Sequence, residues 1–343
     1  MNNKVNMMNI FKLALLAFLC LYGEMASASA LPTDSRLIDI GGRNIHVREQ
    51  GVNQTEPTII LLAGPNENWH SDSAWFALLQ PMLAERFRVI AIDRAGQAWS
   101  DKIEHASYQQ FADDLATVYK KLQLKEVVLV CYSSSNITSL LLQKNHPDVQ
   151  ISAQLWLDPD ILLPHSIALY SGSPASWYKQ NIAEILPHIA QGNWTERTTK
   201  KNNNEQAHIK SLINEANKHW MDWSYFLAIQ AYRTSISAQQ TRAIEIANYA
   251  DDLAAAAKVS PTNAAPITII DTDFELTGID NSNEDYDKLQ KWQREGSQWS
   301  KDIAHESGGY YLPLNTADHL VTFQHPEKVQ AAILQLLSIS KQK

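Results

Sequence analysis

The sequence predicts an α/β fold, with a mostly parallel, twisted β-sheet flanked by helices and an inserted helical cap. Short apolar runs without polar alternation predict strands that are buried on both faces. Helical patterns separate these runs, which is typical of the chain around a parallel sheet. The alternation stops between residues 161 and 261, where the sequence becomes helical and aromatic. These three observations together define the fold class.

The elements follow in order along the chain. A β-hairpin is predicted first, with strands at residues 36–40 and 44–49 joined by Gly41-Gly42. Five apolar strands follow, and helical patterns lie between the first four of them. The strands are predicted at 58–62, 88–92, 127–130, 154–157 and 267–270, and the helices at 74–85, 108–122, 137–145 and, closing the chain, 327–337.

The domain organisation is predicted from the interrupted alternation. Residues 31–160 and 262–343 are expected to form the α/β core, and residues 161–261 a helical cap inserted into it. Within the cap, residues 195–206 are polar and lysine-rich with three successive asparagines, which predicts an exposed loop.

Residues 1–30 are interpreted as a signal peptide. They contain two lysines, an apolar run at 13–21 and small residues at 26–30 that suit a signal peptidase. The alternative, a membrane anchor, needs about 20 apolar residues, and this run is shorter. We therefore expect an exported protein, periplasmic or secreted, without a stable membrane anchor after cleavage.

Composition excludes several classes of protein. The chain has 343 residues, of which 45% are hydrophobic and 19% charged, as in a globular protein. Its formal charge is −8 and no segment gathers Lys and Arg, which argues against nucleic acid as a partner. The two cysteines, Cys20 and Cys131, cannot form a Cys-rich zinc site, so we expect no metal and no cofactor.

Ser133 is the candidate nucleophile. It lies in a sharp turn between the predicted strand 127–130 and the predicted helix 137–145. A serine hydroxyl reacts only when it is exposed beside a base, and such a turn exposes it. The residues two before and two after it, Cys131 and Ser135, are small but are not the glycines usual in this motif. The alternative is that the three serines form only a turn and a helix cap.

At this point the chain resembles the α/β-hydrolase family over nearly all of its mature sequence. Three segments carry the resemblance. They are Leu61-Leu62-Ala63-Gly64-Pro65, which is similar to the family's His-Gly strand end; the turn Asp93-Arg94-Ala95-Gly96-Gln97-Ala98-Trp99-Ser100-Asp101; and Val130-Cys131-Tyr132-Ser133 at the nucleophile elbow. A cap, a late strand and a histidine before a last helix follow in the family's order.

The resemblance implies the rest of a catalytic triad. The family's base corresponds to His319, and its acid follows the strand after the cap, where Glu275 and Asp273 are the candidates. Spacing favours Glu275, and Asp273 replaces it if the loop is shorter. Asp158 and Asp160, after the preceding strand, are a weaker option.

The resemblance also implies an oxyanion hole with two N–H donors. One is expected from Ser134, the residue after the nucleophile. The second corresponds to position 65, but Pro65 has no N–H, so Asn66 is the candidate. Trp69, His70 and Tyr132 are expected to contact the substrate.

The leading hypothesis is an exported serine hydrolase that cleaves a carboxylic ester, amide or lactone of a small apolar molecule through an acyl-enzyme. Two alternatives stay open, a noncatalytic relative that binds a small ligand under the cap and a serine aminopeptidase. The aminopeptidase requires an acidic patch for the substrate amine, which the sequence does not locate. The oligomeric state is not predicted.

Overall fold

The computed structural model of the chain describes residues 31–51, 57–64, 71–261, 265–274 and 286–340. Residues 34–343 form one unit, which the following paragraphs describe. Of the unit that precedes it, residues 1–33, the described part is residues 31–33, and these contain no helix or strand.

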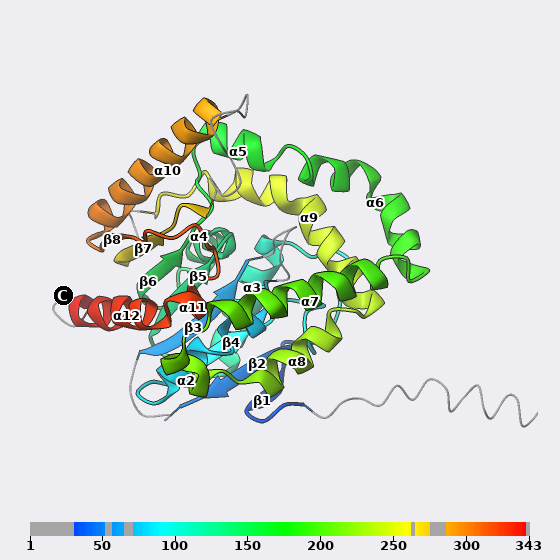
Figure 1. Cartoon of the computed structure of the whole chain (residues 1–343), viewed down its shortest axis with the longest axis horizontal. Coiled ribbons are helices and arrows are strands. Elements are labelled where there is room, and N and C mark those ends of the chain that lie inside the picture. The colour runs from blue at the N-terminus through cyan, green and yellow to red at the C-terminus, as the bar shows by residue number, and fades with distance from the viewer. Residues whose placement is uncertain (1–30, 52–56, 65–70, 262–264, 275–285, 341–343) are drawn as a thin grey trace, which may run out of the picture. The chain divides into compact units, whose positions relative to one another are not determined.

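The described strands form one sheet in the order β1-β2-β4-β3-β5-β6-β7-β8 (Figure 1). The hairpin of β1 (Ser35–Asp39) and β2 (Asn44–Gln50) pairs antiparallel, as does β2 with β4, and every other pair is parallel. The α/β class and the mostly parallel sheet are confirmed. The parallel strands are β3 (Thr58–Ala63), β4 (Val89–Ile92), β5 (Val127–Tyr132), β6 (Ile151–Leu157), β7 (Ile267–Asp271) and β8 (Tyr311–Pro313).

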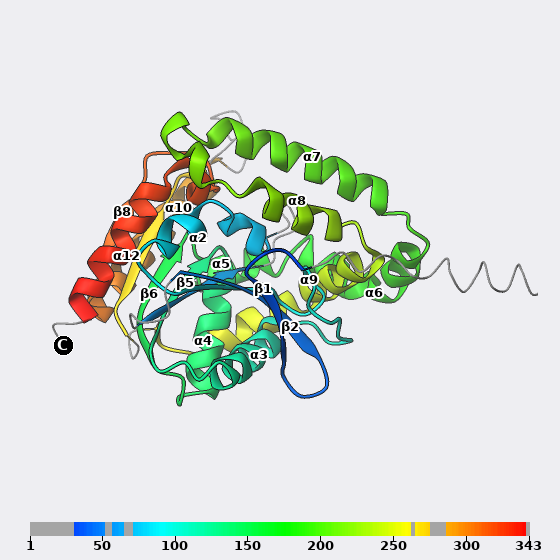
Figure 2. The ribbon, with the colours of Figure 1, turned by 90° about the horizontal axis from the view of Figure 1, so that it is seen from below.

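Helices cover both faces of this sheet, as Figure 2 shows. Successive residues of β3 alternate between the two apolar clusters, because side chains of a strand point to opposite faces in turn. Ile59 and Leu61 belong to one cluster, and Ile60 and Leu62 to the other. The first cluster includes side chains of η1 (Ser73–Phe76), α2 (Leu79–Ala84), α11 (Val321–Gln324) and α12 (Pro326–Ser340); the second includes side chains of α3 (Tyr108–Lys121), α4 (Ser135–Asn145) and α10 (Tyr286–Ser307).

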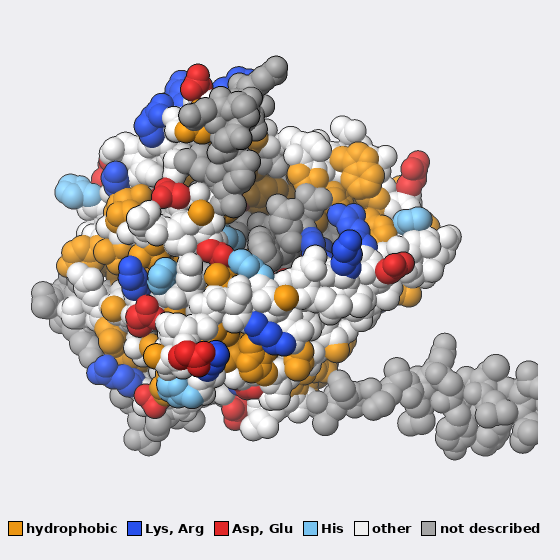
Figure 3. Space-filling model, viewed as in Figure 1, with side chains coloured by type: hydrophobic (Ala, Val, Ile, Leu, Met, Phe, Trp, Pro, Cys, Tyr) orange, Lys and Arg blue, Asp and Glu red, His pale blue; other side chains and the backbone are white. Residues whose placement is uncertain are grey.

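The insertion between β6 and β7 is helical, as predicted. Within it, α6 and α9 pack through a small apolar cluster of their own, which includes Ile185, Ile189 and Ile246. None of the described helices combines the length and apolar character that a membrane span requires. On the face drawn in Figure 3, Lys and Arg side chains lie scattered among Asp and Glu side chains. The helices of the insertion are α5 (Pro164–Tyr170), α6 (Ala175–Ala190), α7 (Thr195–Leu212), η2 (Glu215–Trp220), α8 (Trp223–Tyr232) and α9 (Ile236–Ala256).

The exposed loop predicted at 195–206 is wrong, because these residues lie in helix α7. The buried residues of α7 are Thr198, Asn202, Glu205 and Ile209, whose spacing of four, three and four residues places them on one helical face. Three of these four side chains are polar. Hydrophobic periodicity therefore gives no signal for a helix whose inward face is mostly hydrophilic.

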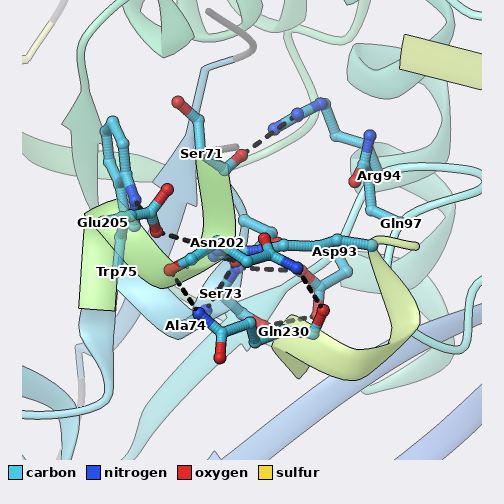
Figure 4. A network of polar contacts seen from close by, with 12 residues as sticks. Ser71, Ser73, Ala74, Trp75, Asp93, Arg94, Gln97, Asn202, Glu205 and Gln230 are labelled. Atoms are coloured by element: carbon cyan, nitrogen blue, oxygen red, sulfur yellow. Dashed lines mark hydrogen bonds and ion pairs between the residues drawn. The ribbon is translucent and has the colours of Figure 1, made fainter. Parts of the chain in front are cut away.

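A buried polar network gives that face its partners (Figure 4). Asn202 and Gln230 exchange two hydrogen bonds, with each side-chain amide donating to the other residue's carbonyl at 3.0 and 2.7 Å. Glu205 accepts from Trp75 Nε1 at 3.3 Å and from Arg233 Nη1 at 2.8 Å. Since Trp75 belongs to η1, these bonds join helices α7 and α8 of the insertion to the core.

Candidate active site

Ser133 occupies a strained turn between β5 and α4. Its φ is +55°, a left-handed conformation that costs a non-glycine residue about 1 to 3 kcal/mol. The Ser133 backbone N–H donates to the Leu157 carbonyl at 2.8 Å, which extends the pairing of β5 with β6 to the turn itself. A conformation of this kind is kept where the surrounding structure fixes it, and the predicted elbow has this geometry.

Two neighbours explain how the turn closes without its usual glycines. Ser135 donates its hydroxyl hydrogen bonds to the Leu62 and Tyr132 carbonyls, both at 2.9 Å. The backbone at Gly64 approaches the turn closely, because a Cβ atom at this position would lie 2.4 Å from Ser135 N. The glycine that the close packing requires is therefore Gly64, outside the turn itself. Cys131 is buried, and burial raises the pKa of its thiol to about 12, so it carries no reactive thiolate.

His319 and Asp158 form a buried pair at the carboxyl ends of the strands. His319 Nδ1 lies 2.9 Å from Asp158 Oδ2. Asp158 also accepts from Thr272, from its backbone N–H at 2.7 Å and its hydroxyl at 2.9 Å. Because a carboxylate only accepts hydrogen bonds, Nδ1 of the imidazole carries the proton and Nε2 of the neutral ring has the lone pair.

The other ring nitrogen of His319 is buried and has no hydrogen-bond partner among the described residues. The ring packs against Trp75, with centroids 5.9 Å apart, and Phe274, at 4.3 Å. The Tyr132 hydroxyl donates to the His319 carbonyl and so fixes its backbone. A buried polar atom without a partner typically costs about 1 to 3 kcal/mol, and such atoms in a native structure often serve catalysis.

A cavity of about 310 Å³ opens beside the turn. Its walls include Ser133, Ser134, Asp158 and Phe274. The elbow, one carboxylate of the buried pair and the aromatic ring packed against His319 therefore face the same space. This volume is at the small end of the range for ligand pockets, about 300 to 1000 Å³.

Among the described residues, the acid bound to His319 is one that the sequence analysis gave as a weaker option. The carboxylate on His319 is Asp158, whereas Asp273 accepts from Gln293 Nε2 at 2.6 Å. Glu275 lies outside the described residues. The sequence did not separate these candidates because β6 and β7 are parallel neighbours. Leu157 of β6 lies opposite Ile270 of β7, so acidic residues follow both strands at the same edge of the sheet.

The residues predicted for the oxyanion hole and for substrate contact lie in different places. Ser134 lies at the amino end of α4 and in the cavity wall. Tyr132 was expected to contact the substrate, but its side chain is fully buried against Trp75 and His319. As the last residue of β5 it points into the core, on the side of the sheet opposite to that of Cys131. Asn66, Trp69 and His70, together with Pro65, lie outside the described residues.

Sequence reasoning did not find several side chains of the cavity. Tyr108, Glu245 and Tyr249 come from helices α3 and α9, far from the motifs in the chain. Glu245 is bound to Arg94 Nε at 2.8 Å, and the Tyr249 hydroxyl donates to Asp160. The sequence marks only Asp160, as the second acid after β6.

The fold and the elbow define a class of protein, hydrolases built on a parallel sheet with a nucleophile after β5. The family model described as the alpha/beta hydrolase family matches residues 59–332, and the chain belongs to this family.

The chain is also similar to individual proteins. A 2-(acetamidomethylene)succinate hydrolase of Mesorhizobium japonicum is 33% identical over 117 residues, which are 34% of this chain and 39% of the relative. The match therefore spans about two fifths of that relative. The structure of an E-2-(acetamidomethylene)succinate hydrolase has a TM-score of 0.54 at 19% identity, covering 89% of this chain and 98% of that one. An enol-lactonase of Burkholderia xenovorans has a TM-score of 0.56 at 16% identity, covering 88% and 100%.

Proposed function

We propose that the chain is a serine hydrolase that cleaves a carboxylic ester, or an amide or lactone, of a small substrate through an acyl-enzyme. Ser133 is the nucleophile, His319 the general base and Asp158 the acid that orients it. One observation carries the proposal: the imidazole is fixed by Asp158 at Nδ1, while its buried Nε2 has no partner in the described part of the chain and Asp158 lines the same cavity as the strained Ser133.

The reaction follows from these positions. Ser133 Oγ attacks the acyl carbon while His319 Nε2 takes its proton, and a tetrahedral intermediate forms. His319 then returns the proton to the leaving oxygen or nitrogen, and the acyl group remains on Ser133. A water molecule, deprotonated at the same Nε2, attacks the acyl-enzyme and releases the acid. Asp158 stays ionised and stabilises the imidazolium in both steps.

The developing oxyanion requires donors that point into the cavity. We propose the backbone N–H of Ser134, because it lies at the amino end of the eleven-residue helix α4, where the helix dipole favours negative charge. The second donor is proposed to be Asn66. A single donor of this kind typically contributes about 100- to 1000-fold to kcat.

The proposal is tested with a fluorophosphonate probe and p-nitrophenyl esters of graded acyl length. Wild-type protein should be labelled, and Ser133→Ala should lose both labelling and turnover while its circular dichroism is unchanged. Ser139→Ala is the matched control. Ser139 lies within α4, and its hydroxyl donates to the Asn136 carbonyl of the same helix. Labelling that persists in Ser133→Ala removes this residue from the mechanism.

Absence of labelling in folded wild-type protein, together with binding of a small ligand in the cavity, would favour the noncatalytic alternative.

We also propose that residues 1–30 direct export and are removed. The observation behind this proposal is the composition of the segment, with basic, apolar and small-residue parts in the order of a signal peptide. Mass spectrometry of the protein expressed from its full-length sequence in a bacterial host should find an amino terminus near residue 31 in the periplasmic or secreted fraction. Full-length protein retained in the cytosol contradicts the proposal.

A further inference from the structure

The cavity beside Ser133 contains a carboxylate that the proposed mechanism does not use. Asp160 follows β6 by three residues, and Asn136 fixes its backbone from both sides. Asp160 N–H donates to Asn136 Oδ1 at 3.2 Å, and Asn136 Nδ2 donates to the Asp160 carbonyl at 2.9 Å. The Tyr249 hydroxyl donates to Asp160 Oδ2. The carboxylate is therefore held in a defined position in the cavity wall.

The charges around the cavity are unbalanced. Its described wall contains three acidic side chains, and none of the described wall residues is Lys, Arg or His. Glu245 is balanced by an ion pair with Arg94, and Asp158 accepts a hydrogen bond from His319 Nδ1. Asp160 has no ion pair with any described cation. A partly buried carboxylate without a counterion is unfavourable unless a ligand supplies the positive charge.

Aromatic side chains flank this carboxylate. Tyr249 contacts it directly, and the Tyr170 hydroxyl accepts from the backbone N–H of Ile161, the next residue, at 3.4 Å. Trp292 packs edge-on against Tyr170 at 6.1 Å and lines the same cavity. Aromatic faces attract cations, and a wall of rings beside a carboxylate is the arrangement that recognises alkylammonium groups.

We propose that the cavity recognises an alkylammonium group on the substrate, with Asp160 as its counterion and Tyr170, Tyr249 and Trp292 as an aromatic wall. This inference rests on the proposed function, because it places the cationic group of the substrate beside the nucleophile Ser133. Asp160 is then a specificity-determining residue, which selects cationic over neutral or anionic substrates.

The first experiment measures binding without catalysis. Isothermal titration compares choline with 3,3-dimethylbutanol, which has the same shape but no charge, on wild-type protein and on Ser133→Ala. We expect choline to bind at least about tenfold more tightly, equivalent to about 1.4 kcal/mol. Choline that binds no more tightly than the neutral alcohol overturns the proposal.

The second experiment measures selectivity in turnover. The kcat/KM for acetylthiocholine is divided by that for the neutral 3,3-dimethylbutyl thioacetate, and the ratio should be about ten or more. Asp160→Asn should lower this ratio to within about twofold of one. Asp251→Asn is the matched control, since Asp251 lies on the same helix as Tyr249 but is exposed and bound to Lys179 at 2.8 Å.

The outcomes separate this inference from the proposed function. A ratio of one in wild-type protein, with turnover that depends on Ser133, overturns cation recognition and leaves the serine mechanism standing. Turnover that survives in Ser133→Ala overturns the mechanism, and the binding experiment still decides on Asp160. An equal fall of the ratio in Asp251→Asn shows a general effect of net charge and refutes the role of Asp160. If Asp160→Asn does not fold by circular dichroism, the wild-type comparison of the two ligands decides.

Discussion

Replacing Asp158 by asparagine is expected to reduce kcat about 10⁴-fold while the fold is retained. Asp158 accepts three hydrogen bonds, one from His319 Nδ1 and two from Thr272. An asparagine has a single acceptor oxygen, and if that oxygen accepts from the Thr272 backbone N–H, its amide faces His319. The imidazole then moves its proton to Nε2 and can no longer accept the proton of Ser133. A 10⁴-fold loss corresponds to about 5 kcal/mol of transition-state stabilisation.

The assay is hydrolysis of a p-nitrophenyl ester, with circular dichroism to check folding. Asp273→Asn is the control, because Asp273 lies after the neighbouring strand but is bound to Gln293, so a change below about threefold is expected. Glu275→Gln completes the set. The assignment of the acid is refuted if Asp158→Asn keeps more than about a tenth of the wild-type kcat. It is also refuted if Glu275→Gln or Asp273→Asn lowers kcat by more than Asp158→Asn does.

Three further predictions follow from other contacts. Gly64→Ala places a Cβ atom 2.4 Å from Ser135 N, so the elbow must shift; we expect a loss of at least about 100-fold in ester hydrolysis, and activity near wild type contradicts the close approach. The pKa of Asp160 is raised to about 6, mainly by burial. The selectivity ratio for cationic over neutral thioester should therefore fall as pH decreases from 7.5 to 5, and a constant ratio argues against Asp160. Burial, followed by the charge of Asp158, raises the pKa of Asp271 from 3.8 to about 7, so its ionised form destabilises the fold. Asp271→Asn should therefore increase Tm by more at pH 8 than at pH 5, because the cost of this carboxyl grows as pH rises from 3.8 to about 7, and the opposite order contradicts this sign.

The sheet and the elbow could be predicted because their signals are local. Strands β3 to β7 are mostly apolar and largely buried on both faces, which hydrophobicity detects. Helix α10 was not predicted, although it has 22 residues. Its inward positions include Gly296 and Ser300, small residues that let the helix pack closely, for example Gly296 against Ile161. The buried face of α10 also contains Trp292, Ile303 and Ala304, so this helix is amphipathic and its periodicity could have been read from the sequence. The polar inward face of α7, in contrast, gives little hydrophobic periodicity.

The acid of the site could not be predicted because the choice depends on side-chain reach across two strands. Asp158 and Asp271 each follow the last paired residue of adjacent parallel strands, so both lie at the same edge. What separates them is their partners: Thr272 donates twice to Asp158, while Asp271 receives a hydrogen bond from the Tyr311 hydroxyl at 3.1 Å. Thr272 and Tyr311 are ordinary residues in the sequence, and only the register makes them donors.

The environments of Asp158 and Asp271 also explain how two carboxyl groups can lie at the same edge of the sheet. Two ionised carboxylates side by side repel each other, and burial adds to the cost, so one of them retains its proton to higher pH. Asp158 has three hydrogen-bond donors to stabilise its charge, His319 Nδ1 and two groups of Thr272. Asp271 has one hydroxyl donor, and its raised pKa of about 7 corresponds to an unfavourable free energy on the order of 4 kcal/mol once it is ionised. The hydrogen-bond donors around each carboxyl therefore decide which one is the charged partner of His319. Below its pKa of about 7, the protonated Asp271 keeps a second negative charge away from the imidazole.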